Sequence, residues 1–370
     1  MSIKKNILLT IRQGKIGGGE THVLQIVKHL DDTKFNVFVL SFTHGEMVNQ
    51  LEKNNIPVFV VKTVKPFDIT IWGKVKKLIS TLKIDLIHAH GTRAMSNTFW
   101  IAKKLSIPII YTVHGWSFHK GENILKYNFK VLLERFLTSS SKVTICVSKS
   151  NQEEGLSLFS LQNSIVIENG IDLIKFNPKK NYKNILEPLG IDTKITIVSY
   201  ISRLTHQKDP FTMIKSFNYL KKSTSDIVLL VIGDGELRSA CETLVKDLEL
   251  ENSVFFLGFR KDIPSYLYWS DIYCLPSLWE GLPIGLLEAM SMEKACIASI
   301  VNGTKEVIQP DVNGLTTPVK DPLVLSENIL KLHHDNTLRK KIATNARRTV
   351  EENYSIERMI KKLERIYHNI

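Results

Sequence analysis

Two glutamates eight positions apart, Glu280 and Glu288, are the residues of this chain whose spacing most directly suggests chemistry. They belong to EGLPIGLLEAM (280–290), where Pro283 is a residue type favoured at the start of a helix. We therefore expect Glu280 in the preceding loop and Glu288 about two turns inside the helix. The helix N-terminus between them would suit a diphosphate, and the two carboxylates could hold sugar and ribose hydroxyls. Two solvated acids beside a buried helix are the alternative.

Two cations stand near the start of the second half of the chain. Arg203 and Lys208 come just after the apolar run TKITIVSYIS (193–202), which has the composition of a buried strand. Cations at such a place can bind the phosphates of a nucleotide diphosphate, and they stabilise it most when it departs and gains charge. A solvated pair on a loop is the alternative. The turn GDGE (233–236) also follows a buried run, but it lacks the GxGxxG spacing of a dehydrogenase.

The N-terminal half combines a glycine turn with histidines at the ends of apolar runs. Gly17–Gly19 follow the first run, where residues without a Cβ atom let the backbone approach a ligand. A flexible turn before a helix would have the same composition. Glu20 and His22 come next, at the expected helix start. His114 ends the run IPIIYTVH (107–114), where a lone histidine is more often a structural hydrogen-bonding residue than a catalytic one.

His88 and His90 alternate along the run DLIHAH (85–90), so both side chains are expected on one face of a strand. Two histidines on one face resemble part of a metal site. No third ligand has a suitable spacing in the sequence. We therefore interpret His88 as structural and His90 as part of a binding site.

Strand-like and helix-like segments alternate along the whole chain to position these residues. Short runs rich in Val and Ile, as in parallel strands buried on both faces, form two series. The series are 6–11, 35–42, 57–62, 85–90, 107–114 and 142–148, then 193–202, 226–233, 253–258, 271–276 and 295–299. Two such series predict two doubly wound α/β domains, with a boundary near the polar stretch within residues 172–192. The tail, 355–370, has apolar residues at helical spacing.

The order of these motifs resembles that of the retaining nucleotide-sugar glycosyltransferases of the GT-B fold, glycosyltransferase family four. The family pattern of Glu-Gly-hydrophobic-Pro with a second Glu eight positions on is matched by EGLPIGLLE, and further matches follow in order: IGGGETH (16–22), DLIHAHG (85–91), YTVHGW (111–116), VIENGID (166–172), SRLTHQKDP (202–210), VIGDGEL (231–237) and FLGFRKDI (256–263). The resemblance implies two Rossmann-like domains facing a cleft. Residues 1–175 would bind the acceptor, residues 176–354 would bind the donor, and the helix 355–370 would cross back onto the first domain.

The resemblance also implies roles for individual residues. The catalytic group would be Glu280, Arg203, Lys208 and His114. Donor contacts would come from Gly18, Gly19, Gly233, Gly235, Gly258, Arg260, Gly281, Leu282, Pro283, Ile284 and Glu288. Glu20, His22 and His90 would lie on the acceptor side. The chain has no Asp-x-Asp at a strand end, the usual means of holding a metal on the diphosphate in other glycosyltransferases, so we expect neither a metal nor a cofactor.

We therefore expect retaining transfer of a sugar from a nucleotide-diphosphate sugar, with UDP as the favoured nucleotide, to a sugar or lipid-linked sugar acceptor. A carboxylate positioned for a covalent intermediate is not evident, which favours same-face attack in which a donor phosphate oxygen takes the acceptor proton. Cell-surface polysaccharide or glycolipid synthesis is the expected setting. A nucleotide-sugar epimerase or phosphorylase of the same fold, and a non-catalytic sugar-nucleotide-binding subunit, remain alternatives.

Composition and charge narrow the location and the partners. The chain lacks the roughly 18–20 uncharged apolar residues in a row that a membrane span needs. Its four scattered cysteines, Cys146, Cys241, Cys274 and Cys296, suggest reduced thiols in a cytoplasmic protein. The net charge of +12 is concentrated in residues 1–175, which carry 23 Lys/Arg against 13 Asp/Glu. An anionic partner is therefore expected there, and nucleic acid is disfavoured because no recognition motif is present.

Two cationic amphipathic segments raise the alternative of peripheral attachment to the inner face of the cell membrane. One spans residues 62–83 and includes Lys74, Lys76 and Lys77 among apolar residues. The other spans residues 120–135 and mixes basic side chains with Leu and Phe. Either could lie on an anionic leaflet, or could be an ordinary helix that packs one face on the sheet.

Overall fold

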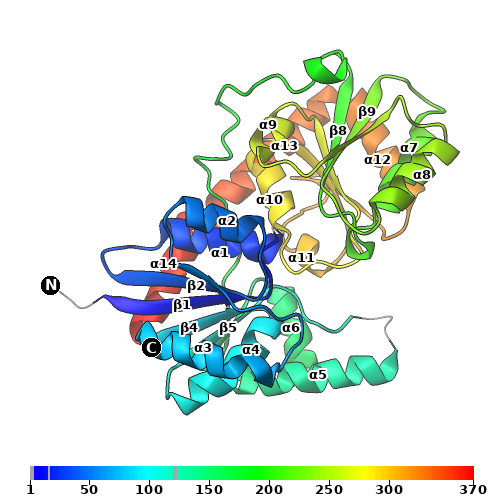
Figure 1. Cartoon of the computed structure of the whole chain (residues 1–370). Coiled ribbons are helices and arrows are strands. Elements are labelled where there is room, and N and C mark those ends of the chain that lie inside the picture. The colour runs from blue at the N-terminus through cyan, green and yellow to red at the C-terminus, as the bar shows by residue number, and fades with distance from the viewer. Residues whose placement is uncertain (1–3, 16, 120–122) are drawn as a thin grey trace. The chain divides into compact units, whose positions relative to one another are not determined.

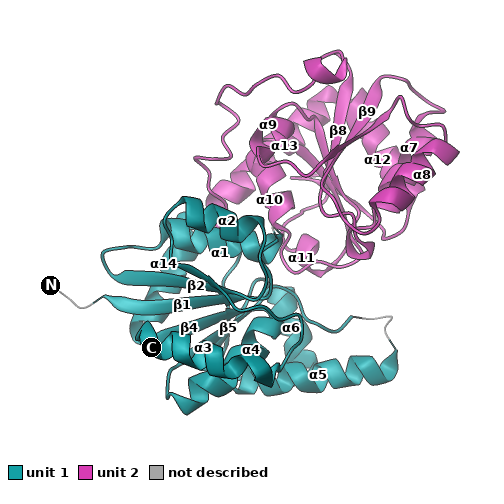
Figure 2. Ribbon diagram, viewed as in Figure 1, with its two compact units in different colours: residues 1–170, 356–370 teal, residues 171–355 magenta. Residues whose placement is uncertain are grey.

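The computed structural model describes residues 4–15, 17–119 and 123–370, and it divides the chain into two compact units. Unit 1 comprises Met1–Gly170 and Ile356–Ile370, and unit 2 comprises Ile171–Ser355 (Figure 2). The sequence had placed the division at 175/176. It falls earlier because the Ile171 backbone N–H donates to the carbonyl of Tyr354 at 2.8 Å, and Ile171 pairs with Ser355 in a parallel bridge. These contacts join residues 171–175 to the second unit.

Unit 1 is a seven-stranded parallel sheet in the order β3-β2-β1-β4-β5-β6-β7 (Figure 1). Its elements are β1 (Lys5–Ile11), α1 (Gly18–His29), β2 (Phe35–Ser41), α2 (Glu46–Lys53), β3 (Val58–Val60), α3 (Ile69–Thr81), β4 (Leu86–His90), α4 (Thr92–Lys104), β5 (Ile109–Val113), α5 (Ile124–Ser139), β6 (Val143–Cys146), α6 (Lys149–Leu158), β7 (Ser164–Val166) and α14 (Ile356–Asn369). One face of the sheet packs on α3, α4 and α5, and the other packs on α1, α2 and α14. The C-terminal helix thus returns to the N-terminal unit through buried residues such as Met359 and Leu363.

Unit 2 is a six-stranded parallel sheet in the order β10-β9-β8-β11-β12-β13. Its elements are η1 (Glu187–Leu189), β8 (Thr196–Ile201), η2 (His206–Lys208), α7 (Pro210–Leu220), β9 (Ile227–Ile232), α8 (Arg238–Asp247), β10 (Val254–Gly258), α9 (Ile263–Tyr268), β11 (Ile272–Leu275), α10 (Ile284–Ser291), β12 (Ala295–Ser299), α11 (Asn302–Lys305), β13 (Leu315–Thr317), α12 (Pro322–His334) and α13 (Asn336–Asn353). The two-domain, doubly wound α/β prediction is confirmed. All four cysteines are buried and free, as predicted.

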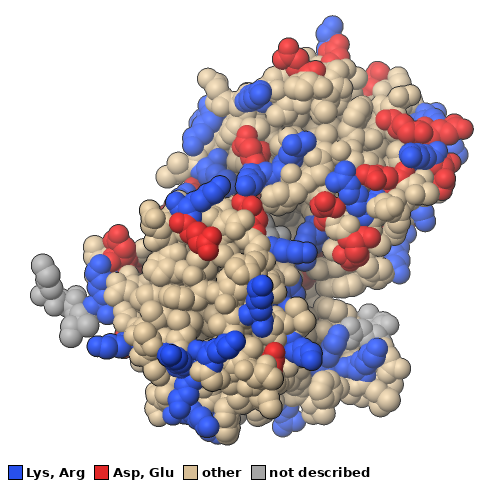
Figure 3. Space-filling view, in the orientation of Figure 1, with Lys and Arg blue, Asp and Glu red and all other residues tan. Residues whose placement is uncertain are grey.

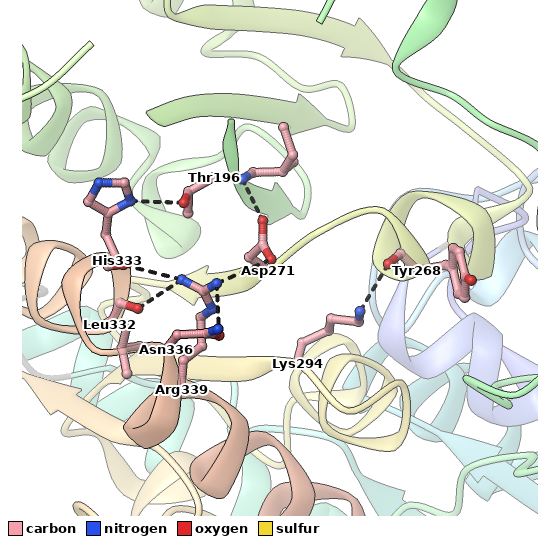
Figure 4. Close-up of polar contacts among 9 residues, drawn as sticks. Thr196, Tyr268, Asp271, Lys294, Leu332, His333, Asn336 and Arg339 are labelled. Atoms are coloured by element: carbon pink, nitrogen blue, oxygen red, sulfur yellow. Dashed lines mark hydrogen bonds and ion pairs between the residues drawn. The ribbon is translucent and has the colours of Figure 1, made fainter. Parts of the chain in front are cut away.

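A polar network fixes the amino ends of the unit 2 strands (Figure 4). The Asp271 carboxylate, just before β11, accepts from the backbone N–H of Ile197 at 2.9 Å. Arg339 of α13 lies 3.9 Å from that carboxylate and donates to the carbonyl of Leu332 on α12 at 2.9 Å. These contacts join the strand starts to the covering helices. They leave the opposite, carboxyl edge of the sheet to the loops that carry the predicted site residues.

Every helix within the described residues is too short or too polar to serve as a membrane span.

Candidate functional site

In both units the predicted site residues follow the strands where the sheet order reverses direction. In unit 1 the reversal lies between β1 and β4, and in unit 2 it lies between β8 and β11. The connections after these strands leave in opposite directions, so they open a crevice at the carboxyl edge where ligands of open α/β sheets bind. Gly18 and His90 stand beyond the first pair of strands, and Arg203 and Glu280 stand beyond the second. The structure therefore places these predicted residues at the carboxyl edge of the sheet in each unit.

Lys208 and Glu280 form an ion pair at the carboxyl edge of unit 2. The side chains of Lys208 and Glu280 are only 17% and 6% exposed, so water screens the pair weakly. Two hydrogen bonds hold their loops together: the Gln207 side chain donates to the carbonyl of Trp279 at 2.9 Å, and the backbone N–H of Leu278 donates to the carbonyl of Gln207 at 2.8 Å. The predicted phosphate-binding cation and sugar-orienting acid are thus partners of one another.

Asp209 turns the chain sharply after Lys208. Its backbone has φ 45° and ψ 60°, in the left-handed region, and its carboxylate caps α7 by accepting from the backbone N–H of Thr212 at 3.2 Å. The buried Tyr200 hydroxyl donates to the carbonyl of Lys208 at 3.1 Å. A capped helix and a buried tyrosine therefore hold the lysine at the strand end.

Two of the predicted donor-site glycines are required by close backbone packing. A Cβ atom on Gly233 would lie 1.9 Å from the carbonyl oxygen of Ser202, and one on Gly235 would lie 2.3 Å from that of Leu204. Gly233 also has φ +138°, which L side chains rarely adopt, and its N–H donates to the carbonyl of Gly258 at 2.9 Å. The loops after β8, β9 and β10 thus stack backbone on backbone. This stacking fixes the course of the loop that contains Arg203.

The helix α10 begins at Ile284 with Pro283 as its N-cap, so its N-terminus lies between the two glutamates as predicted. The predicted depth of Glu288 is wrong: it is the fifth helical residue and stands about one turn inside, because the helix begins four residues after Glu280. Burial raises the pKa of the half-buried Glu288 carboxyl to about 7, against a smaller opposing effect of Lys175. Leu282, Pro283 and Ile284 are buried, which leaves their backbone groups as the means of contacting a ligand.

Arg203 and Arg260 differ in their surroundings. Arg203 is half-buried, and among the described residues its guanidinium has no ion-pair partner. Arg260 is exposed and lines a cavity of about 430 Å³ with Lys183, Leu257 and Tyr266. Arg203 is therefore a cation available for an anion at the switch point. Arg260, a predicted donor contact, belongs to a pocket beside β10.

Three polar side chains that the sequence analysis did not single out stand at the same edge of unit 2. The hydroxyls of Thr205, Ser277 and Ser299 are buried and lack a hydrogen-bond partner in the part of the chain that the structure describes. Each comes after, or at the end of, a strand in the centre of the sheet. Buried hydroxyls without partners are costly, so they are candidates for contact with a polar ligand. Their strand-end positions were the signal that could have identified them.

The glycine turn of unit 1 faces the histidine at the end of β5. Gly17 caps α1, and a Cβ atom on Gly19 would lie 3.3 Å from the ring of His114. Glu20, on the first turn of α1, is 2% exposed, and its carboxylate lies 3.9 Å from the guanidinium of Arg12. The turn is therefore packed against other predicted site residues.

Three predicted site histidines of unit 1 meet in one cluster, His22, His90 and His114. One ring nitrogen from each lies within 4.8 Å of the others, and Nδ1 of His90 is 3.1 Å from Nε2 of His114. Spacing along the sequence offers no third ligand for a metal, but the fold places His22 from α1 and His114 from the end of β5 beside His90. Burial lowers the pKa of His22 to about 4 and holds the pKa values of His90 and His114 well below the ordinary value. Neutral imidazoles can coordinate a metal ion or hydrogen-bond a hydroxyl.

His88 has a different environment from this cluster. Its Nδ1 lies 2.6 Å from the hydroxyl of Tyr367 on α14, and its Nε2 lies 2.6 Å from Oγ1 of Thr112. Both ring nitrogens are therefore occupied, which agrees with the structural interpretation. The centre of the His88 ring also lies 4.1 Å from that of His90, with the two rings tilted by 33°, so the C-terminal helix supports the cluster indirectly.

The two edges offer complementary chemistry. Unit 2 presents two cations, a helix N-terminus and two carboxylates, which together can hold a diphosphate and the hydroxyls attached to it. Unit 1 presents neutral imidazoles, which can orient an uncharged hydroxyl. Groups of the first kind suit an activated phosphate ester, and groups of the second kind suit an alcohol.

Comparison with known protein families matches both halves of the chain. The model described as "Glycosyltransferase Family 4" matches residues 16–175, and the model described as "Glycosyl transferases group 1" matches residues 181–349. The two matches correspond to most of unit 1 and most of unit 2. The first match includes the strand-end histidines of unit 1, and the second includes Arg203, Lys208 and Glu280 of unit 2.

Relatives and solved structures cover nearly the whole chain. A Campylobacter jejuni N,N'-diacetylbacillosaminyl-diphospho-undecaprenol alpha-1,3-N-acetylgalactosaminyltransferase is 31% identical over 94% of this chain and 96% of its own length. An Escherichia coli UDP-Gal:alpha-D-GlcNAc-diphosphoundecaprenol alpha-1,3-galactosyltransferase is 27% identical over 95% and 94%. The Anabaena protein HepE, crystallised with UDP and glucose, superposes with a TM-score of 0.87 at 22% identity and covers 99% of this chain and 100% of its own.

Proposed function

Because this chain belongs to the family 4 glycosyltransferases of the GT-B fold, we propose that it transfers a sugar from a UDP-sugar to a hydroxyl of a lipid-linked sugar. The donor would bind at the carboxyl edge of unit 2 and the acceptor at that of unit 1. The names of two relatives support the acceptor class, since both act on a sugar carried by diphosphoundecaprenol. UDP is supported by the galactosyltransferase relative, whose donor is UDP-Gal.

The Lys208–Glu280 ion pair is the observation that carries this proposal. It sets a cation and an acid side by side ahead of the α10 N-terminus, at the switch point of the sheet. In a nucleotide-sugar donor the diphosphate and the sugar are likewise adjacent, so the diphosphate could face the cation while the sugar faces the acid. On binding, the diphosphate would compete with Glu280 for Lys208, and Glu280 would turn to hydroxyls of the sugar.

We infer that transfer retains the anomeric configuration through same-face attack. The bond between the anomeric carbon and the diphosphate oxygen breaks, and the acceptor oxygen bonds to that carbon from the same face. The acceptor proton passes to an oxygen of the departing diphosphate. Arg203, Lys208 and the N–H groups of α10 would stabilise the negative charge of that leaving group. His114 would orient the sugar from the acceptor side.

A panel of UDP-, GDP- and ADP-sugars tests the donor and the reaction together. We expect thermal stabilisation by UDP and its sugars, and nucleotide release that depends on an acceptor bearing a lipid-linked sugar. NMR of the product would report the anomeric configuration. Release without any acceptor dependence would favour the epimerase or phosphorylase alternative, and binding without turnover would favour the non-catalytic subunit.

We also propose that transfer needs no metal ion. The anion-binding groups of unit 2 support this, because cations and a helix N-terminus can replace a metal on the diphosphate. The cluster of His22, His90 and His114 makes the test necessary, since three imidazoles are a ligand set used by zinc. Activity should survive EDTA. Loss of activity in EDTA and recovery with Zn²⁺ or Mn²⁺ would overturn the proposal.

A lipid-linked acceptor is presented at a bilayer surface. We therefore propose peripheral association of unit 1 with an anionic leaflet, for which the net +10 of residues 1–175 gives electrostatic support. The cytoplasmic side of the cell membrane is the corresponding location.

A further inference from the structure

The helix α5 carries large apolar side chains on two opposite faces. Leu137 is fully buried in the core of unit 1. Leu125, Phe129, Leu132 and Phe136 are 76%, 68%, 61% and 48% exposed. An ordinary surface helix exposes charged and polar residues on its outer face, whereas the outer face of α5 exposes large apolar ones.

The four exposed side chains form a continuous stripe. Their positions are spaced by four, three and four residues, which at 3.6 residues per turn places them within an arc of about 60°. Glu134 lies on the opposite side of the helix and is fully buried, where it accepts from the hydroxyl of Tyr111 at 2.8 Å and from that of Thr92 at 2.7 Å. These contacts fix the rotation of α5 about its own axis. The apolar stripe is consequently held outward by the core.

Basic side chains flank the stripe. Lys126 and Arg135 are exposed on α5, and the same helix has no acidic residue other than the buried Glu134. Between Asp85 and Glu153 the sequence contains nine Lys/Arg and only two acids, Glu122 and Glu134. In Figure 3 basic side chains predominate over acidic ones on the part of unit 1 that contains α3, α4 and α5.

The neighbouring helix α4 extends the same surface. Trp100 is 39% exposed, and the ammonium of Lys103 lies 5.8 Å from the centre of its ring. Phe99 joins the helices, since its ring centre lies 5.3 Å from that of Phe136 and 6.4 Å from that of Trp100. An exposed tryptophan beside lysines is typical of side chains at a membrane–water interface.

The other cationic segment of the sequence, residues 62–83, lacks such a face. On α3 the lysines Lys74, Lys76 and Lys77 are exposed, while Val75 and Ile79 are fully buried. Among the apolar residues of α3, Ile69 at its first position is exposed and the others pack on the core. The structure therefore favours the ordinary-helix alternative for this segment.

We propose that the stripe of Leu125, Phe129, Leu132 and Phe136 inserts into an anionic phospholipid leaflet, with Lys126, Arg135 and the Trp100–Lys103 pair at the headgroups. Apolar side chains supply the insertion, and the flanking cations supply the preference for anionic lipid. The inference deepens the proposed function and rests on it for the source of the acceptor. It identifies which element of unit 1 contacts the membrane.

Sedimentation of the full chain with vesicles tests this surface. Wild-type protein should bind phosphatidylcholine vesicles that contain phosphatidylglycerol, bind pure phosphatidylcholine weakly, and dissociate progressively as salt rises. The triple variant Leu125→Ser, Phe129→Ser, Leu132→Ser should lower the partition coefficient at least about tenfold, roughly 1.4 kcal/mol. Because these side chains are exposed, the variant should unfold at the wild-type temperature.

Two controls isolate the stripe. Ile174→Ser, which removes an apolar side chain 73% exposed on unit 2, should leave vesicle binding unchanged. Neutralising Lys74, Lys76 and Lys77 to Gln should reduce binding far less than the triple variant does. Wild-type binding by the triple variant, or equal binding of both vesicle types by the wild-type protein, would overturn the proposal. So would a dimer that the triple variant converts to monomer without any effect on vesicle binding, because the stripe would then be a self-interface.

Activity with an acceptor that lacks the lipid tail separates this inference from the proposed function. The triple variant should retain the wild-type kcat with that acceptor and lose activity with acceptor embedded in vesicles. If no donor supports transfer while vesicle binding still depends on the stripe, the proposed function fails and the membrane surface stands. If transfer occurs and the protein does not bind vesicles, the proposed function stands and the membrane surface fails.

Discussion

The two strand-end sites of this molecule are built at equivalent places in equivalent sheets, yet they differ in charge. The unit 2 edge contains the Lys208–Glu280 ion pair and the guanidinium of Arg203, which has no ion-pair partner within residues 4–15, 17–119 and 123–370. The unit 1 edge centres on His22, His90 and His114, whose pKa values are all lowered by burial, so the cluster is uncharged at neutral pH. A diphosphate needs cations, whereas an acceptor hydroxyl needs neutral hydrogen-bonding groups. The difference between the edges is the one that donor and acceptor chemistry would require.

The largest effect should follow removal of a cation from unit 2. Lys208→Ala and Arg203→Ala should each lower kcat/KM by roughly 10²–10³, the usual scale for losing one preorganised charge stabiliser. Steady-state kinetics with saturating acceptor measures this. Lys215→Ala, which removes an exposed lysine of α7, is the matched control and should leave kcat/KM unchanged. Because Lys208→Ala also leaves the carboxylate of Glu280 buried and unpaired, its unfolding temperature must be measured in parallel. A loss of less than about threefold would refute the assigned role.

Acid should destabilise unit 1 through its neutral histidines. The pKa of His22 falls from 6.5 to about 4 in the folded protein, so the unfolded chain binds a proton more readily. The stabilising contribution is present above pH 6.5 and is lost as pH falls towards 4, on the order of 3 kcal/mol for this residue. Urea denaturation across that range should show the loss, and His22→Gln should reduce its slope. His44→Ala, at an exposed position, should not.

Glu288 should impose the opposite pH dependence on unit 2. Its folded pKa of about 7 lies above the ordinary 4.5, so the folded state holds the proton more tightly. The free energy of unfolding should therefore fall as pH rises from 4.5 to 7, by on the order of 3 kcal/mol for this residue. Glu288→Gln should remove this decline and stabilise the protein at pH 8.

The same variant should weaken nucleotide binding, because a carboxylate that accepts from two ribose hydroxyls loses one acceptor. Calorimetry should show wild-type UDP affinity falling as pH drops through 7, and no such dependence in Glu288→Gln. Glu280→Gln should spare UDP affinity and reduce transfer. Equal losses of UDP affinity in both variants would contradict this division of roles.

The smallest effect is expected for His114. His114→Ala should lower kcat about tenfold, the scale of one hydrogen bond, with UDP affinity unchanged. An equal loss of UDP affinity would mean that the histidine cluster contributes to nucleotide binding. The two edges would then not divide into a donor site and an acceptor site. His44→Ala again serves as the exposed control.

The sequence predicted the architecture well because buried parallel strands leave a local signature. Runs such as 6–11 and 226–233 are rich in Ile, Leu and Val, and they appear as β1 and β9. The strands that were missed, β7 and β13, have three residues each and lie at sheet edges, where a short segment has neither length nor two-sided burial to mark it. The positions of Arg203, Lys208 and Glu280 just after strands were likewise local, and the structure places them at the switch point.

Distances between residues far apart in the chain were decided by the tertiary structure alone. Spacing along the sequence did not connect His22 with His90 and His114, because a sheet order of β1-β4-β5 is needed to bring α1 and two strand ends together. The pairing of Lys208 with Glu280 has the same origin.

The two cationic segments had similar compositions, and composition could not separate them. Only burial could do so, since each apolar residue of α3 or α5 faces the core or the solvent according to how its helix is rotated on the sheet. That rotation is fixed by contacts such as those of Glu134 with Tyr111 and Thr92. Local patterns therefore determined which elements form and where the reactive residues stand along them. The packing of those elements determined which side chains meet and which face remains outside, because both depend on neighbours that the local sequence does not contain.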